Sequence, residues 1–227
     1  MRSEIKRAAV LAPGQIRHVL RVTEATSQQP QRDAVILLLG LSVGMRISEI
    51  AQLHVREMMF PEGALRSEVS LTQRITKGGR QRTVYFTSHK LIAAIERYLE
   101  FRIERDLGTT LDESRFRGLN PHLPLVLSRK GYPYALNRKT RISASGEEVN
   151  YWAADALQFY VTKLYRAAGL KNCSSHSGRR TFATNLLRKG ATLEQIQQLL
   201  GHQDVDDTLR YVETDDAVLR RAFEDVI

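Results

Sequence analysis

Apolar residues recur at helical spacing along much of the chain and predict a mostly helical fold. Pro13 suits the first turn of a helix, and the apolar positions that follow it, at 16, 19, 20 and 22, continue with helical spacing. Residues 34–43 are apolar on nearly all sides, which is typical of a helix buried at the centre of a domain. Apolar stripes at 91–99 and 157–165 predict two further amphipathic helices.

The last predicted helix has recognisable start and stop signals. Thr192 and Gln195 fit a capping box, in which each side chain bonds to the backbone N–H of the other residue. Gly201 would end the helix, because glycine readily takes the left-handed conformation found after a last turn. The buried face between these signals is formed by Leu193, Ile196, Leu199 and Leu200.

Strand signals occur mainly in the middle of the chain. Segments 69–75 and 82–86 are rich in β-forming residues and flank Lys77-Gly78-Gly79, so they predict a hairpin whose turn carries Lys77. Segment 107–146 contains Gly, Pro and Ser throughout, and we expect an irregular surface excursion around one short strand at 125–127. These patterns together predict an α-rich α+β fold with a small antiparallel β-sheet.

Composition narrows the class of protein. A length of 227 residues is enough for one large domain, or one domain with a short appendage, and 42% hydrophobic residues are ordinary for a globular chain. A single cysteine, Cys173, excludes an internal disulfide framework and fits a reducing compartment. The longest apolar run, 34–45, is too short to span a membrane, and the N-terminus lacks the apolar core of a secretory signal. We therefore expect a cytoplasmic protein with no membrane partner.

The net charge of +9 is unevenly distributed. Segments 72–88, 115–146 and 161–190 contain many basic residues and no acidic one, whereas the chain after Gly190 has a net charge of −6, from nine acids and three arginines. One such run could be an ordinary solvated face, but three predict a basic groove that follows the phosphates of a nucleic acid. The residues expected to contact the nucleic acid are Arg74, Arg80, Arg138, Lys139, Arg141 and Arg180.

Several common catalytic chemistries find no support in the sequence. It has no phosphate-binding loop of the Walker type, no HExxH, no paired-cysteine zinc pattern and no GxSxG elbow. The basic runs contain no carboxylates that could hold the metal of a nuclease, so no metal and no cofactor are expected. Arginine forks, His and Lys for proton transfer and a hydroxyl nucleophile could still act on a phosphodiester.

Four motifs in order resemble those of the tyrosine recombinase (phage integrase) family. Residues 44–50 (GMRISEI) resemble its first box, and 176–184 (HSGRRTFAT) resemble its second. The third box is similar to 199–202 (LLGH) followed by 208–211 (TLRY), and 76–79 (TKGG) resembles the family's lysine hairpin. Each motif alone is weak, but the ordered set covers the chain from about Pro13 to the C-terminus.

The resemblance implies a role for each residue that matches a motif. Arg46 and Arg179 would bind the non-bridging oxygens of the scissile phosphate through their planar guanidiniums. Tyr211 would attack phosphorus and form a 3′-phosphotyrosyl link, and His176 would be the leading general base for its proton.

The resemblance also implies three supporting roles. His202 would hydrogen-bond a phosphate oxygen, and Lys77 would protonate the 5′-oxygen leaving group. Glu49 would orient the catalytic groups without touching DNA. Ordinary structural explanations exist for single residues: Lys77 could be a routine hairpin tip, and Tyr211 a packing residue.

The chain departs from the family pattern in two ways. Gly178 stands before Arg179, where the family usually has an apolar residue, so looser packing is expected there. We divide the chain into an N-terminal extension, 1–12, and a catalytic domain, 13–227, with a C-terminal tail at about 214–227. So few residues precede Pro13 that no N-terminal core-binding domain is expected, as in a catalytic-domain-only enzyme or a fragment.

The sequence therefore predicts a site-specific DNA recombinase or integrase that works without metal or ATP, of the kind found on mobile genetic elements. Double-stranded DNA would be its substrate, accessory DNA-bending or directionality proteins could take part, and the tail would join it to a second copy or pack in cis. A type IB topoisomerase is one alternative, because it would use the same residues without synapsis. The other alternative is a DNA-binding protein without activity, either a remnant or a competitor of a recombinase that has all its domains.

Overall fold

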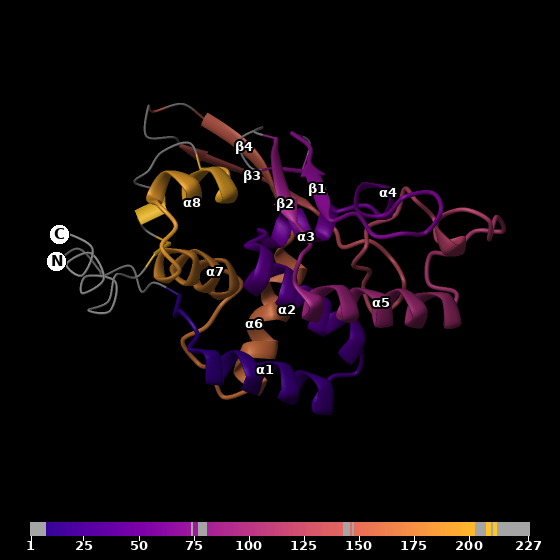
Figure 1. The fold of residues 1–227 in the computed structure, drawn as a ribbon, viewed down its shortest axis with the longest axis horizontal. Coiled ribbons are helices and arrows are strands. Elements are labelled where there is room, and N and C mark those ends of the chain that lie inside the picture. The colour runs from indigo at the N-terminus through magenta and orange to yellow at the C-terminus, as the bar shows by residue number, and fades with distance from the viewer. Residues whose placement is uncertain are drawn as a thin grey trace.

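The computed structural model describes residues 8–73, 75–76, 81–142, 146, 148–202, 208–209 and 211–212. At its centre lies α2 (Pro30–Val43), which packs against α1 (Pro13–Thr26), α5 (His89–Glu104) and α7 (Ser177–Arg188) (Figure 1). Seven apolar residues of α2 are buried: Val35, Ile36, Leu37, Leu38, Leu39, Leu41 and Val43. The predicted central helix is confirmed, and it is buried on several sides because helices surround it.

The remaining predicted helices are also confirmed. Pro13 begins α1 at the first helical position, and the stripe at 157–165 lies in α6 (Asp155–Ala167). The capping box begins α8 (Leu193–Leu200), where the Gln195 N–H donates to Thr192 Oγ1 over 3.2 Å. The structure also contains shorter elements, which are α3 (Ile47–Gln52), α4 (Val55–Met58) and the 3₁₀ turn η1 (Phe116–Gly118).

The predicted hairpin is present as β1 (Glu68–Leu71) paired antiparallel with β2 (Arg82–Tyr85). The register places Glu68 opposite Tyr85 and Leu71 opposite Arg82. Alternate residues face the interior, so Val69 and Leu71 of β1 are buried, as are Arg82 and Val84 of β2. A guanidinium therefore enters the interior on the same face of β2 as a valine.

The prediction for segment 107–146 was wrong in part. A second antiparallel hairpin, β3 (Asn137–Ile142) with β4 (Glu148–Ala153), begins inside it. The pattern missed β3 because its residues are mostly polar and show no alternation of apolar and polar positions.

Residues 125–127 are buried but do not form the predicted strand. The Leu125 N–H donates to the Leu53 carbonyl over 2.7 Å, and the Leu127 N–H donates to the Tyr98 hydroxyl over 3.2 Å. Burial of this apolar run therefore comes from packing into the core rather than from strand pairing.

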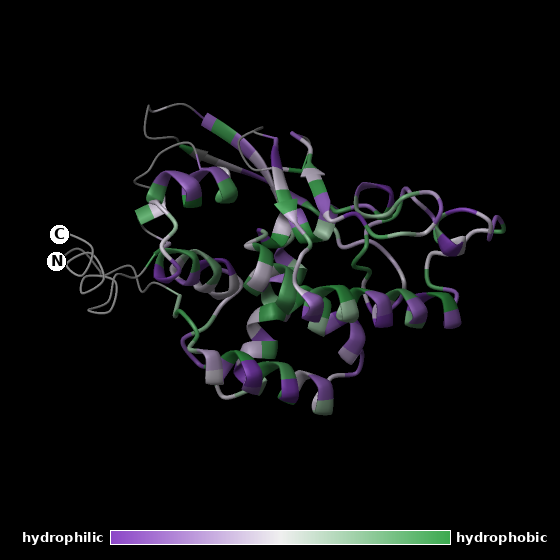
Figure 2. Ribbon diagram, in the orientation of Figure 1, coloured by the Kyte–Doolittle hydropathy of each residue, from purple (hydrophilic) through white to green (hydrophobic). Residues whose placement is uncertain are grey.

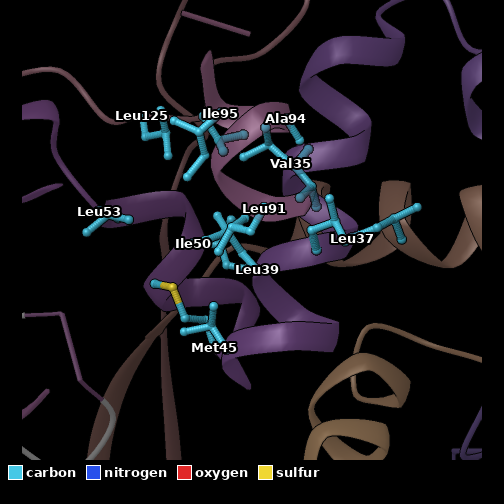
Figure 3. Close-up of a cluster of buried hydrophobic side chains, with 14 of the residues drawn as sticks. Val35, Leu37, Leu39, Met45, Ile50, Leu53, Leu91, Ala94, Ile95 and Leu125 are labelled. Carbon is cyan, nitrogen blue, oxygen red and sulfur yellow. The ribbon is translucent and has the colours of Figure 1, made fainter. Parts of the chain in front are cut away.

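Hydrophobic residues form two buried clusters. The larger surrounds α2, and Figure 3 shows Met45 and Ile50 lying with Leu39 and Leu91 in it. The smaller one lies under α7 and α8 and contains Ala183, Ile196, Leu200 and Val212. Figure 2 shows the hydrophobic residues concentrated on inward-facing parts of the helices, with hydrophilic residues on their outer surfaces. Among the described helices, none combines the length and apolar character that crossing a membrane requires.

Candidate active site

Arg46 is placed by a sharp change of chain direction after α2. Gly44 ends α2 with φ of 70°, and Arg46 then becomes the N-cap residue of α3. A side chain at Gly44 would meet the Phe182 ring at 2.4 Å, so glycine is required there for conformation and for space. The buried neighbours Met45 and Ile50 hold the backbone in the core, while the Arg46 side chain reaches toward the C-terminal end of α8 and donates to the Gly201 carbonyl.

Glu49 is a fully buried carboxylate between two guanidiniums. It accepts from Arg46 Nη1 at 2.8 Å, from the Arg46 backbone N–H at 2.7 Å and from Arg82 Nη2 at 2.6 Å. Burial alone would raise the pKa of this carboxyl, but the nearby charges of Arg82, Arg46 and Arg179 outweigh it and lower the pKa to about 2. Glu49 is therefore ionised at neutral pH, and its hydrogen bonds fix the position of the Arg46 guanidinium.

Arg82 is a member of the site that we did not select from the sequence. Its guanidinium binds Glu49 of α3 and also donates to the Leu199 carbonyl in the last turn of α8. It therefore connects the first residue of β2 to segments 44–50 and 199–202, two of the segments whose sequences resemble motifs of the family. The available signal was the alternation of β2, which places Arg82 on the same inward face as Val84.

Arg179 lies on α7 and is almost completely buried. Its Nη1 donates to the Gly44 carbonyl over 2.6 Å, and its Nη2 donates to the Leu200 carbonyl. Burial and the nearby charges of Arg46 and Arg82 hold its pKa well below the usual value for arginine. Within the described part of the chain, its Nε has no hydrogen-bond acceptor.

Gly178 brings α7 unusually close to α2. A Cβ added at Gly178 would lie 3.0 Å from the carbonyl carbon of Gly40 and 3.2 Å from its Cα. The looser packing expected from this departure from the family pattern is therefore wrong. Glycine here permits closer backbone packing, which places Arg179 beside the end of α2.

His202 follows Gly201, which ends α8 with φ of 62°. Its Nε2 is 3.0 Å from Arg179 Nη2, and its Nδ1 is 2.9 Å from Thr208 Oγ1. Burial, then the nearby charges of Arg179, Arg46 and Arg82, lower the pKa of this imidazole to about 3. A guanidinium can only donate, so the neutral ring accepts at Nε2 and carries its proton on Nδ1, which donates to Thr208.

Tyr211 packs against the same two residues. Its ring centroid lies 4.9 Å from that of His202, and the Arg179 Cζ lies 5.5 Å from the Tyr211 ring centroid. The structure thus brings together five of the predicted site residues, which are Arg46, Glu49, Arg179, His202 and Tyr211, and adds Arg82.

The other predicted residues have different positions. His176 is the exposed N-cap residue of α7, one turn before Arg179. Arg138 and Lys139 are exposed on β3. Arg180 is buried and its guanidinium donates to the Ala8 carbonyl, so it is directed toward the N-terminal segment. Four predicted parts of the site lie outside the described residues: Arg74, Lys77, Arg80 and the tail from 213 onward. The side chain of Arg141 is not described either.

The assembled groups form an anion site. Three guanidiniums and one carboxylate give the cluster a net charge of +2, and the imidazole is neutral at pH 7. Such a cluster, next to a tyrosine, can bind a phosphodiester and stabilise the extra negative charge of its transition state. The described residues bring together no group of three or more His, Cys, Asp or Glu side chains that could hold a metal ion.

The sequence of this chain is similar to those of known proteins. Residues 9–217 match the model of the phage integrase family. Tyrosine recombinase XerA of Pyrococcus horikoshii is 32% identical over 193 residues, which cover 85% of this chain and 54% of that protein. Tyrosine recombinase XerC of Staphylococcus epidermidis is 28% identical over 207 residues, or 90% and 57% of the two chains. The chain thus spans a little over half the length of these relatives.

Solved structures agree on the fold. The crystal structure of XerA recombinase superposes with a TM-score of 0.67 at 21% identity, and the match covers 96% of this chain and 65% of that one. XerH site-specific recombinase, in a post-cleavage complex with its palindromic difH substrate, gives 0.63 at 20% identity and covers 98% and 54%. At this level of identity the likeness establishes the fold, which is the predicted α-rich α+β class.

Proposed function

Because this chain belongs to the phage integrase family of tyrosine recombinases, we propose that it carries the catalytic function of a site-specific DNA recombinase or integrase. Double-stranded DNA is the proposed substrate, and the reaction cleaves and rejoins strands through a covalent tyrosine intermediate. The observation that carries the proposal is the cluster of Arg46, Glu49 and Arg179, in which the buried Arg179 lies against the rings of His202 and Tyr211.

Cleavage proceeds by one displacement at phosphorus. The Tyr211 oxygen forms a bond to phosphorus, and the bond from phosphorus to the 5′-oxygen breaks, which leaves a 3′-phosphotyrosine. The tyrosine proton passes to His176, and Lys77 protonates the departing 5′-oxygen. Rejoining reverses these steps when the 5′-hydroxyl of another strand attacks, so the energy of the phosphodiester is conserved and ATP is not required.

Arg46 and Arg179 are suited to binding the scissile phosphate. The Arg179 Nε is a buried donor without an acceptor in the described chain, and a phosphate oxygen would supply one. Arg46 is the most exposed of the charged groups in the cluster, with 17% of its side chain accessible, so the phosphate would approach past it.

His202 requires a change of tautomer to donate to the phosphate. In the structure its Nε2 accepts from Arg179, so this nitrogen carries no proton. When Arg179 turns to a phosphate, Nε2 can take the proton, provided that Nδ1 then accepts from Thr208. A hydroxyl can donate or accept, so Thr208 supports both tautomers without moving.

The proposed DNA surface includes Arg138, Lys139 and Arg141 of β3 together with Arg74 and Arg80 near the lysine turn. Arg180 is left out, because its buried guanidinium bonds to the Ala8 carbonyl. We further propose that a second copy of the chain binds through the tail at about 214–227. Accessory DNA-bending proteins are also proposed to take part. The proposed place of the reaction is the cytoplasm.

A nicked duplex tests this function. Nicked substrates made from the DNA that flanks the gene trap a cleaved intermediate, because the short fragment next to the nick diffuses away. We expect a covalent protein–DNA adduct with the wild type, the same adduct in EDTA, and none with Tyr211→Phe. DNA binding without any adduct would favour a DNA-binding remnant, and relaxation of a supercoiled plasmid without a specific site would favour a topoisomerase. Loss of the adduct in EDTA would contradict the metal-free chemistry.

A further inference from the structure

The hairpin of β3 and β4 has one face turned outward along its whole length. Residues directly opposite each other on this face form three cross-strand pairs: Arg138 with Trp152, Thr140 with Asn150 and Ile142 with Glu148. All six residues are exposed. Figure 1 shows the hairpin running along the upper edge of the molecule, the edge toward which the β1–β2 hairpin also points.

The opposite face of the hairpin is directed toward the body of the protein. Asp155, the first residue of α6, accepts from Lys139 Nζ over 2.7 Å and from Asn137 Nδ2 over 2.9 Å. On the neighbouring strand, Tyr151 and Val149 belong to this inner face and are partly buried. These contacts hold the base of the hairpin and fix which face remains available.

The outer face has the features of a surface that binds a partner. Trp152 is 52% exposed and Ile142 is 73% exposed, which leaves large apolar side chains in water. Arg138 is the basic residue of this face and Glu148 the acidic one, so the six residues carry no net charge. The face suits a partner that offers hydrogen-bond acceptors to Arg138 and apolar groups to Ile142.

We propose that the outer face of the β3–β4 hairpin enters the major groove of the DNA near the cleavage site and reads its base sequence. This inference rests on the proposed function. A major groove about 12 Å wide accepts a two-stranded β-ribbon, whose strands lie about 5 Å apart. Each strand of the hairpin has six residues, which span about 20 Å, or several base pairs.

The side chains on the outer face are of the types that recognise base edges. Arginine donates to guanine O6 and N7, asparagine binds adenine N6 and N7, and apolar groups contact the thymine methyl. Asn150 Oδ1 accepts from Thr140 Oγ1 over 2.8 Å, and this bond orients the amide before DNA arrives. We assign Arg138 and Asn150 as the principal specificity residues, with Ile142 as a methyl contact.

The single tryptophan of the chain provides a direct test, because Trp152 lies on this hairpin. Titration with a mixture of random-sequence duplexes, with binding followed in parallel by gel shift, is expected to change the tryptophan fluorescence in step with binding. A gel shift without any fluorescence change would overturn the proposal, and so would the absence of binding to any duplex in the library.

Selection of bound duplexes from the same library tests specificity. We expect the wild type to enrich a motif, and Arg138→Ala and Asn150→Ala each to lose discrimination at one position by roughly ten- to a hundred-fold. Arg105→Ala, which removes the same charge from the exposed C-terminal cap of α5, should enrich the wild-type motif. An unchanged motif in both hairpin variants, or no enriched motif at all, would refute the inference.

The hairpin and the proposed reaction can fail separately. Adduct formation with a nicked duplex depends on Tyr211, whereas motif enrichment requires only binding. A Tyr211-dependent adduct together with an unchanged motif would remove the hairpin proposal and leave the reaction standing. A motif that shifts in the hairpin variants, without any adduct from the wild type, would remove the proposed reaction and leave the hairpin proposal standing. Melting curves of the variants, expected to match the wild type, establish that a changed motif does not come from unfolding.

Discussion

At the scale of single residues, the site is organised by a carboxylate that would not itself contact DNA. Glu49 receives hydrogen bonds from Arg46 and Arg82, and both side chains also reach carbonyls at the end of α8. A buried charge is tolerated only when it is paired and hydrogen-bonded, which holds for Glu49. The arginines are thereby oriented before a phosphate arrives.

Arg82 is expected to be a positioning residue. Arg82→Gln should slow formation of the tyrosine adduct by roughly 10- to 100-fold with little change in DNA affinity, because it removes one partner of Glu49 without removing a predicted phosphate ligand. Arg82→Lys, which keeps the charge, should recover part of the rate. Single-turnover cleavage and gel-shift titration measure the two quantities. A loss of affinity that matches the loss of rate would show that Arg82 contacts DNA directly.

His202 makes stability depend on pH in a predictable direction. Its folded-state pKa of about 3 lies below the ordinary 6.5, so the unfolded chain binds more protons between these values, and stability falls as the pH drops below 6.5. The slope that this residue contributes approaches about 1.4 kcal/mol per pH unit.

Urea unfolding of the wild type and His202→Gln at several pH values tests this expectation. Between about pH 6 and pH 4 the wild type should lose stability more steeply than the variant, and above about pH 7.5 the difference between them should be constant. Parallel pH profiles over the whole range would contradict a buried neutral histidine.

At the scale of elements, the packing of α7 on α2 decides where Arg179 lies. Gly178 and Gly40 allow the two backbones to approach closely, and Arg179 then reaches the Gly44 carbonyl at the end of α2. Arg82 similarly ties β2 to α3 and α8. The positions of Arg179 and Glu49 therefore depend on contacts with elements that are distant in sequence.

Gly178→Ala should destabilise the protein by about 1–3 kcal/mol and slow adduct formation, because the added Cβ would lie 3.0 Å from backbone atoms of Gly40. Gly14→Ala is the matched control. Gly14 also occupies the second position of a helix, but its nearest neighbouring atom would be 3.9 Å away, at the flexible end of Arg17. The control should be neutral or slightly stabilising. Equal urea midpoints for the two variants would show that α2 and α7 tolerate a wider separation.

At the scale of the whole molecule, the site lies where two hydrophobic clusters meet. Arg46 and Glu49 adjoin Met45 and Ile50 of the cluster around α2, whereas Tyr211 packs against the cluster of α7 and α8 and His202 packs against Tyr211. Arg179 is bonded to both sides, through Gly44 and through Leu200. The residues of the candidate site, far apart in sequence, are thus brought together by the packing of these elements.

Much of the fold follows from local patterns in the sequence. The central helix, the amphipathic helices, the capping box of Thr192 and the β1–β2 hairpin were predictable, because each depends on residues close together in the chain. The β3–β4 hairpin was not, because its outer face is exposed and β3 is mostly polar, without alternation of apolar and polar positions. Leu125 and its neighbours looked like a strand because burial alone does not distinguish a strand from a packed loop.

For the site, the sequence by itself determined which residue types are present and in what order, from Arg46 through Arg179 to Tyr211. Tertiary structure alone decided that Arg82 joins them, that Arg180 turns away, and that His202 is neutral with its proton on Nδ1. The physical reason is that burial and charge–charge contacts depend on residues brought together from distant parts of the chain. No local pattern contains the distance between two such groups.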